Sequence, residues 1–177
     1  ALPVPTLEQL RRHIGPPLRQ YLPKLLQLSP ASAGAVIDQL LPEFRRHHDQ
    51  HGWRHFCLYN GVADLLAQLS AGGWSLHVVT HKPLHLAEKL LQQEGLAVLF
   101  ESLHAPGRSD WRNKATALHH LIQSDSNVHW YVGDTDSDRE AAVKAGYRFV
   151  AANYGYGLCV ASDAEITAPL ELLRLLR

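Results

Sequence analysis

The stretch that decides the fold of this chain is VHWYVGDTDSD, residues 128–138. Residues 128–132 are mostly of types that favour β-strands, and they run directly into a glycine and three closely spaced aspartates. The residues that follow, up to Gly146, are rich in alanine and have a helical pattern. The stretch therefore predicts a strand, a tight acidic loop and a helix.

Two of the three aspartates, Asp134 and Asp138, are candidate ligands of Mg²⁺. In an open α/β sheet, ligands bind outside the carboxyl ends of the strands, and carboxylate oxygens suit this cation. Asp136, between them, is expected to face solvent or to cap the helix. A plainer interpretation stays open, in which the loop is a solvated acidic turn favoured by the helix dipole alone.

Composition limits the classes of function. A chain of 177 residues has room for one domain with a full core, or for a core domain with a small appendage. The 17 basic and 17 acidic residues balance, so we expect no nucleic-acid partner and no anionic membrane surface. No apolar run approaches the roughly 20 residues of a membrane span. Cys57 and Cys159 share no metal-ligand spacing, and a reduced, cytoplasmic compartment is expected.

The chain changes character near residue 56. Before it, three helices are predicted. The first runs from a capping box at Thr6 to a stop at residues 15–17, the second lies near residues 18–26, and the third spans residues 31–51. Pro42 kinks the third helix or begins a new one. After it, strands are predicted at residues 74–80, 100–105, 128–133 and 147–151. Helices lie between and after them: one from Gly61 to Gly72, and others at residues 83–93, 113–123, beyond Asp138 and about 168–176. This alternation indicates an α/β fold with a parallel sheet.

The order of three motifs resembles that of the haloacid dehalogenase-like (HAD) hydrolases. Val78-Val79-Thr80 at a strand end, Lys114 at a helix start, and Gly133-Asp134 with Asp138 are similar to motifs II, III and IV of that family. Five local sequences are similar to its phosphoglycolate phosphatase-like branch: Ile14-Gly15-Pro16-Pro17-Leu18, Tyr59-Asn60-Gly61-Val62, Thr80-His81-Lys82, Ala145-Gly146 and Gly155-Tyr156-Gly157.

The resemblance implies a two-part fold. Residues 57–177 would form a Rossmann-like parallel sheet core, and residues 1–56 would be part of a small all-helical cap. The family's first strand lies in the middle of the sheet, between the strands at 74–80 and 128–133, and it has no match in this chain. Without it, two rows of backbone groups would lack partners, at about 1–3 kcal/mol for each buried group.

The resemblance also implies an activity: Mg²⁺-dependent hydrolysis of small phosphorylated metabolites through a phospho-aspartyl intermediate. Thr80 and Lys114 would be catalytic, and Asp134 and Asp138 would hold the metal. The phosphate group would be bound by Thr80, His81, Lys82 and Lys114. Taken singly, Thr80 also fits an ordinary strand residue and Lys114 a solvated helix lysine.

The family's nucleophile and general acid/base are aspartates in a D-x-D sequence after the first strand, and no such sequence precedes residue 57. We therefore expect these 177 residues alone to be inactive, and the natural protein to carry about 25–30 further residues upstream.

Other possibilities remain open. The protein can be a catalytically inactive family member that binds phosphate or a partner protein. It can also be a 2-haloacid dehalogenase, although that chemistry needs no Mg²⁺ and so does not explain the acidic loop. The spacing of His47, His51 and His55, with His48 between them, allows a Zn²⁺ site on one face of an unbroken helix, but Gly52-Trp53 is expected to break that helix. The substrate is not indicated, and the oligomeric state is expected to be a monomer or a homodimer.

Overall fold

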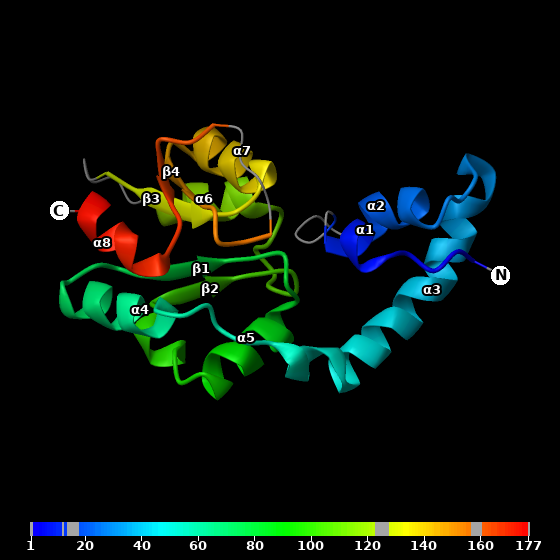
Figure 1. The fold of residues 1–177 in the computed structure, drawn as a ribbon, viewed down its shortest axis with the longest axis horizontal. Coiled ribbons are helices and arrows are strands. Elements are labelled where there is room, and N and C mark those ends of the chain that lie inside the picture. The colour runs from blue at the N-terminus through cyan, green and yellow to red at the C-terminus, as the bar shows by residue number, and fades with distance from the viewer. Residues whose placement is uncertain (1, 12, 14–17, 123–127, 157–160, 177) are drawn as a thin grey trace. The chain divides into compact units, whose positions relative to one another are not determined.

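The structure is a computed structural model that describes residues 2–11, 13, 18–122, 128–156 and 161–176. The chain divides into two compact units, Ala1–Phe56 and Cys57–Arg177, which are drawn together in Figure 1. Several predicted features lie outside the described residues: Ile14 and the helix stop at residues 15–17, the predicted helix end at Gln123, and Gly157 of the last turn.

The first unit is helical, as predicted. Its elements are α1 (Leu7–Arg11), α2 (Leu18–Leu25), α3 (Pro30–Gln50) and the 3-10 helix η1 (Gly52–His55). The predicted capping box is confirmed, since Gln9 N donates to Thr6 Oγ1 at 3.2 Å and Thr6 N donates to Gln9 Oε1 at 2.9 Å. Four buried residues from α2, α3 and the turn between them form the core: Leu22, Leu26, Ile37 and Leu41.

One alternative for α3 is wrong, because Pro42 does not begin a new helix. Residues Pro30–Gln50 form one helix with Pro42 inside it. Ile37 and Leu41, on the turns before the proline, are 1% and 2% exposed and pack against α2. This packing offsets the hydrogen bond that a proline removes.

The second unit alternates helices and strands, which confirms the α/β prediction. Its first half contains α4 (Val62–Ala71), β1 (His77–Val79), α5 (Leu84–Gln93), η2 (Ala97–Leu99), β2 (Ser102–His104) and α6 (Lys114–Leu121). Its second half contains β3 (Trp130–Gly133), α7 (Asp136–Ala145), β4 (Arg148–Ala152), β5 (Ala164–Ile166), η3 (Pro169–Glu171) and α8 (Leu172–Leu175).

All described strand pairs are parallel, and they form two sheets. One sheet has the order β1–β2 and the other β3–β4–β5. Among the described residues, no strand pairs with both β1 and β3, the two strands between which the family's first strand is expected. Because every pair is parallel, the carboxyl ends of the strands within each sheet share one edge.

Strand β5 was not predicted. It is only three residues long, and the side chain of Asp163, just before it, continues the pairing with β4. Phe149 N donates to Asp163 Oδ2 at 2.7 Å, and Asp163 N donates to Phe149 O at 3.0 Å. Tertiary pairing therefore forms this strand where the local pattern is too short to indicate it.

Strand β4 is the centre of the core. Its residues Phe149, Val150 and Ala151 have no exposed surface. Val150 packs with Leu65 and Leu69 of α4 and with Ile166, whereas Phe149 and Ala151 pack with Ala142 of α7. Both faces of this sheet are thus covered by helices, and β3 and its acidic loop lie beside its most buried strand.

We predict that replacing Phe149 with alanine lowers the free energy of unfolding by about 3–5 kcal/mol, because a fully buried ring leaves a cavity. The measurement is urea unfolding followed by circular dichroism. The control is Val143→Ala on α7, a side chain that is 60% exposed, with an expected change of about 0.5 kcal/mol or less. Equal effects of the two changes would contradict this description of the core.

Candidate active site

The acidic loop is held by a capping box at the start of α7. Thr135 Oγ1 accepts a hydrogen bond from Asp138 N at 3.2 Å, and Asp138 Oδ2 accepts one from Thr135 N at 3.2 Å. Thr135, and not Asp136, is therefore the capping residue, while Asp136 is exposed. A Cβ on Gly133 would lie 2.5 Å from Asp138 Cβ, so only glycine lets Asp138 pack against the end of β3.

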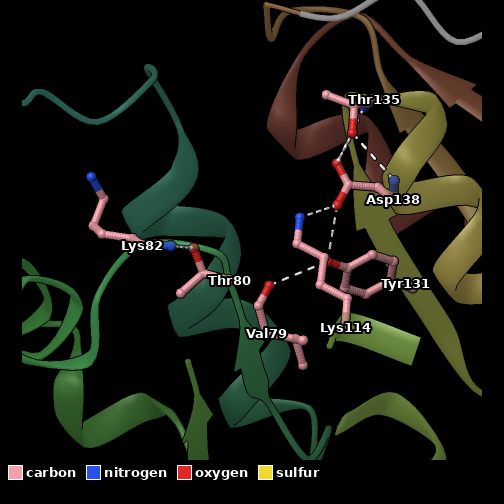
Figure 2. A network of polar contacts seen from close by, with 7 residues as sticks. All are labelled: Val79, Thr80, Lys82, Lys114, Tyr131, Thr135 and Asp138. Atoms are coloured by element: carbon pink, nitrogen blue, oxygen red, sulfur yellow. Dashed lines mark hydrogen bonds and ion pairs between the residues drawn. The ribbon is translucent and has the colours of Figure 1, made fainter. Parts of the chain in front are cut away.

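Lys114 reaches the same carboxylate from the start of α6. Asn113 caps this helix, since its Oδ1 accepts from Thr116 N at 2.9 Å. Lys114 Nζ lies 2.5 Å from Asp138 Oδ1, and the two side chains are only 12% and 6% exposed. Figure 2 shows this ion pair with the groups that surround it. The solvated-lysine interpretation of Lys114 is therefore wrong.

Each oxygen of Asp138 receives two hydrogen-bond donors. Oδ1 accepts from Lys114 Nζ and, at 3.2 Å, from the hydroxyl of Tyr131. Oδ2 accepts from Thr135 Oγ1 at 2.7 Å and from Thr135 N. A carboxylate has about four lone-pair positions, so this set fills them.

The charge of Asp138 is stable at neutral pH. Burial alone would raise the pKa of its carboxyl group. The attraction of the Lys114 ammonium and hydrogen bonds from Lys114, Thr135 and Tyr131 outweigh burial and lower that pKa below its ordinary value. The carboxyl group of Asp138 is therefore ionised at neutral pH.

Thr80 and its neighbours form a turn at the carboxyl end of β1. Thr80 N donates to His104 O at 3.0 Å, and Thr80 Oγ1 accepts from Lys82 N at 3.1 Å. Figure 2 shows this Thr80–Lys82 contact, and it shows the side chain of Lys82 pointing away from the Lys114–Asp138 pair. Burial lowers the pKa of the Lys82 ammonium.

His81 and Lys114 share a pocket of about 150 Å³ between α6 and α7. Its lining is His81, Asn113, Lys114, Ala115, Ser137, Glu140, Ala141 and Lys144, and it includes none of Thr80, Lys82, Asp134 and Asp138. A larger pocket, of about 220 Å³, lies beside α5 and β2 and contains none of the predicted site residues.

Asp134 is held from a different direction, by the loop after β4. Its Oδ2 accepts from Tyr156 N at 2.7 Å. A Cβ on Gly155 would lie 2.5 Å from the Asp134 carboxylate, so the backbone of this loop packs directly on the side chain. Burial, followed by the charge of Asp134, raises the pKa of Tyr154.

The described residues provide only part of a Mg²⁺ site. No group of three or more His, Cys, Asp or Glu side chains within the described ranges is arranged to hold a metal ion. Both oxygens of Asp138 already accept hydrogen bonds from two donors each. Assignment of Asp134 and Asp138 to Mg²⁺ therefore stays a prediction.

The four histidines do not lie on one unbroken helix, although the ring centroids of His47 and His51 are 5.1 Å apart. Helix α3 ends at Gln50 and η1 begins at Gly52, as the glycine indicated. The same search of the described residues gives no metal site at His47, His48, His51 and His55.

Thr135 and Tyr131 belong to this site but were not predicted from the sequence. Thr135 had a usable signal, because a threonine three residues before an acid matches the capping-box pattern. Tyr131 had none, since a tyrosine within a strand does not indicate where its hydroxyl lies.

Comparison with known proteins matches the chain to one family of hydrolases. A family model described as haloacid dehalogenase-like hydrolase matches residues 1–152. The N-acetylmuramic acid 6-phosphate phosphatase of Pseudomonas putida is 33% identical over 125 residues, which are 68% of this chain and 56% of that protein. The phosphoglycolate phosphatase of Aliivibrio fischeri is 30% identical over 159 residues, 85% of this chain and 70% of that protein.

Among solved structures, the haloacid dehalogenase-like protein SP0104 from Streptococcus pneumoniae has the same fold. Its TM-score is 0.85 at 22% identity, over 99% of this chain and 83% of that one. The chain spans little more than half of the Pseudomonas relative.

We predict that Lys114→Met lowers the free energy of unfolding at pH 7 by about 3–5 kcal/mol, because it leaves a buried carboxylate without its counter-charge. Ionised Asp138 stabilises the folded protein at pH values above the pKa that it has in the unfolded chain. This contribution is lost as the pH falls through the lower pKa that it has in the folded protein. The effect of Lys114→Met should therefore shrink in acid.

The control is Lys144→Met. Lys144 lies 4.0 Å from Glu140, and these side chains are 69% and 60% exposed. An exposed pair of this kind contributes about 1 kcal/mol or less. Urea unfolding from about pH 2 to 7, a range that extends below the ordinary Asp pKa of about 3.9, measures both variants, and a pH-independent effect of Lys114→Met would refute the prediction.

Proposed function

The chain belongs to the haloacid dehalogenase-like hydrolase family, and we propose that its protein is a Mg²⁺-dependent phosphatase of small phosphorylated metabolites. The observation that carries this proposal is the buried Lys114–Asp138 pair beside a pocket that His81 also lines. Phosphoryl transfer depends mainly on positioning and on compensation of negative charge, and a fixed ammonium provides both.

Lys114 would contact the transferring phosphoryl group. Asp138 holds the ammonium in place at 2.5 Å, and most of that side chain is shielded from water. Because it does not have to reorient when charge develops on the phosphoryl oxygens, its attraction acts at little reorganisation cost.

Thr80 would donate a hydrogen bond to a phosphoryl oxygen. Its hydroxyl oxygen already accepts from Lys82 N at 3.1 Å. A hydroxyl that accepts in this way still has its own proton to donate. His81 and Lys82 would add positive charge at the same end of β1.

Mg²⁺ would be held in part by Asp134, with Asp138 acting through water or by fixing Lys114. When bound, the cation would neutralise charge on the phosphoryl oxygens. In the family, hydrolysis passes through a phospho-aspartyl intermediate, and we propose the same route here. No residue of this chain matches the nucleophilic aspartate, none is proposed in its place, and these 177 residues alone should be inactive.

The helical first unit would serve as part of a cap that excludes water and selects the substrate. We propose that the substrate is a small phosphate ester. Its identity is left open, because the similar proteins are named for different substrates, N-acetylmuramic acid 6-phosphate and phosphoglycolate. A cytoplasmic location and a monomeric or homodimeric state stay predictions.

An assay of the natural protein with p-nitrophenyl phosphate, with and without Mg²⁺, tests the proposal. We expect hydrolysis that depends on Mg²⁺. Release of halide from a 2-haloacid without metal would instead identify a dehalogenase. Lack of both activities, together with binding of inorganic phosphate, would identify an inactive phosphate-binding member of the family.

We predict that Asp134→Asn in the natural protein raises the Mg²⁺ concentration needed for half-maximal activity by about tenfold to a hundredfold, because it removes a carboxylate near the metal. The matched control is Asp136→Asn. Asp136 is exposed and lies 3.8 Å from Arg139 in an ion pair on the surface of α7. Identical metal titrations for the two variants would remove Asp134 from the site.

A further inference from the structure

The hydroxyl of Tyr131 lies between two parts of the candidate site. It is 3.2 Å from the carbonyl oxygen of Val79, the last residue of β1, and 3.2 Å from Asp138 Oδ1. Figure 2 shows both contacts, and it shows Lys114 on the same carboxylate. Because β1 and β3 belong to separate sheets, this hydroxyl joins strands that are not paired through their backbones.

The ring of Tyr131 is fixed by packing. It contacts the cluster of Leu118, Ala141 and Ala145, in which Val79 also packs. Figure 1 shows α6 and α7, which supply the three cluster residues, side by side. The position of the hydroxyl is therefore set by the core of the unit and not by solvent.

The hydroxyl has one proton and two acceptors, a neutral carbonyl and an ionised carboxylate. Hydrogen bonds to an ionised acceptor are the stronger kind. The bond to Asp138 Oδ1 is therefore the stronger of the two contacts.

We infer that Tyr131 is a positioning residue. Its hydroxyl orients Asp138, and Asp138 in turn orients the Lys114 ammonium, relative to the end of β1, which Thr80 follows. This inference rests on the proposed function, because it assigns Tyr131 a role in aligning the two groups that would bind phosphate. Loss of the hydroxyl leaves Oδ1 with Lys114 alone and removes the polar link to β1.

The chain contains a matched control in Tyr147. Its hydroxyl donates to Leu118 O at 3.1 Å, and its ring packs against the same cluster under α6 and α7. Burial raises the pKa of Tyr147. Like Tyr131, Tyr147 is a partly buried tyrosine whose hydroxyl donates to a backbone carbonyl. Unlike Tyr131, it has no described contact between its hydroxyl and a carboxylate.

The first test compares Tyr131→Phe with Tyr147→Phe in the natural protein, using p-nitrophenyl phosphate and Mg²⁺. Tyr131→Phe should lower kcat about tenfold, the loss expected for one hydrogen bond to a charged group, while KM changes about twofold or less. Tyr147→Phe should leave both constants within about twofold. Equal kcat values for the two variants would overturn the inference.

The second test does not depend on activity. The NMR signal of the Lys114 ammonium is assigned by its absence in Lys114→Met. It should shift or broaden in Tyr131→Phe and stay in place in Tyr147→Phe. An unchanged signal in Tyr131→Phe overturns the inference even if the protein is a phosphatase. A shifted signal in a protein without phosphatase activity supports the link to Lys114 and rejects the proposed function instead.

If Tyr131→Phe fails to fold, the rate at which the Tyr131 hydroxyl proton exchanges with water in the wild-type protein tests the inference instead. A Tyr131 hydroxyl proton protected from exchange supports the inference. A proton that exchanges with water as fast as that of an exposed tyrosine overturns it.

Discussion

Burial of opposite charges at the edge of the sheet is the constraint on which the second unit depends. Moving an ammonium and a carboxylate out of water costs several kcal/mol for each ion, and their attraction offsets this only when the remaining hydrogen-bonding positions are filled. At Asp138 they are filled by Lys114, Tyr131 and Thr135. These residues belong to three different segments, so the ion pair requires α6, β3 and the start of α7 to be in place together.

The same arrangement explains why the site lies where it does. Parallel pairing brings the carboxyl ends of the strands to one edge within each sheet. Thr80 follows β1 of one sheet, and Asp134 and Asp138 follow β3 of the other. Two glycines make the close packing possible, since a Cβ on Gly133 or Gly155 would collide with an aspartate side chain. The groups that would bind a phosphate therefore also hold the helices and strands of this unit together.

Sequence reasoning reached the features that are encoded locally. The strand, loop and helix of residues 130–145 followed from β-forming residues, a glycine and an alanine-rich helical pattern, and the α/β class followed from the alternation of strands and helices. The role of Lys114 came from its resemblance to a family motif, not from its own surroundings. Strand β5 and the hydroxyl of Tyr131 were missed because tertiary contacts determine both. Tertiary packing also decides between the two alternatives that the sequence left open at Pro42.

The central claim is that Thr80 and Lys114 act on one anion at the edge of the sheet. A crystal structure of the natural protein with bound tungstate, a phosphate analogue, tests it most directly. The account predicts a tungstate with oxygens about 3 Å from both Lys114 Nζ and Thr80 Oγ1, and an Asp138 that still holds the ammonium. A tungstate bound elsewhere, or a separation of more than about 12 Å between Thr80 Oγ1 and Lys114 Nζ, would contradict the account.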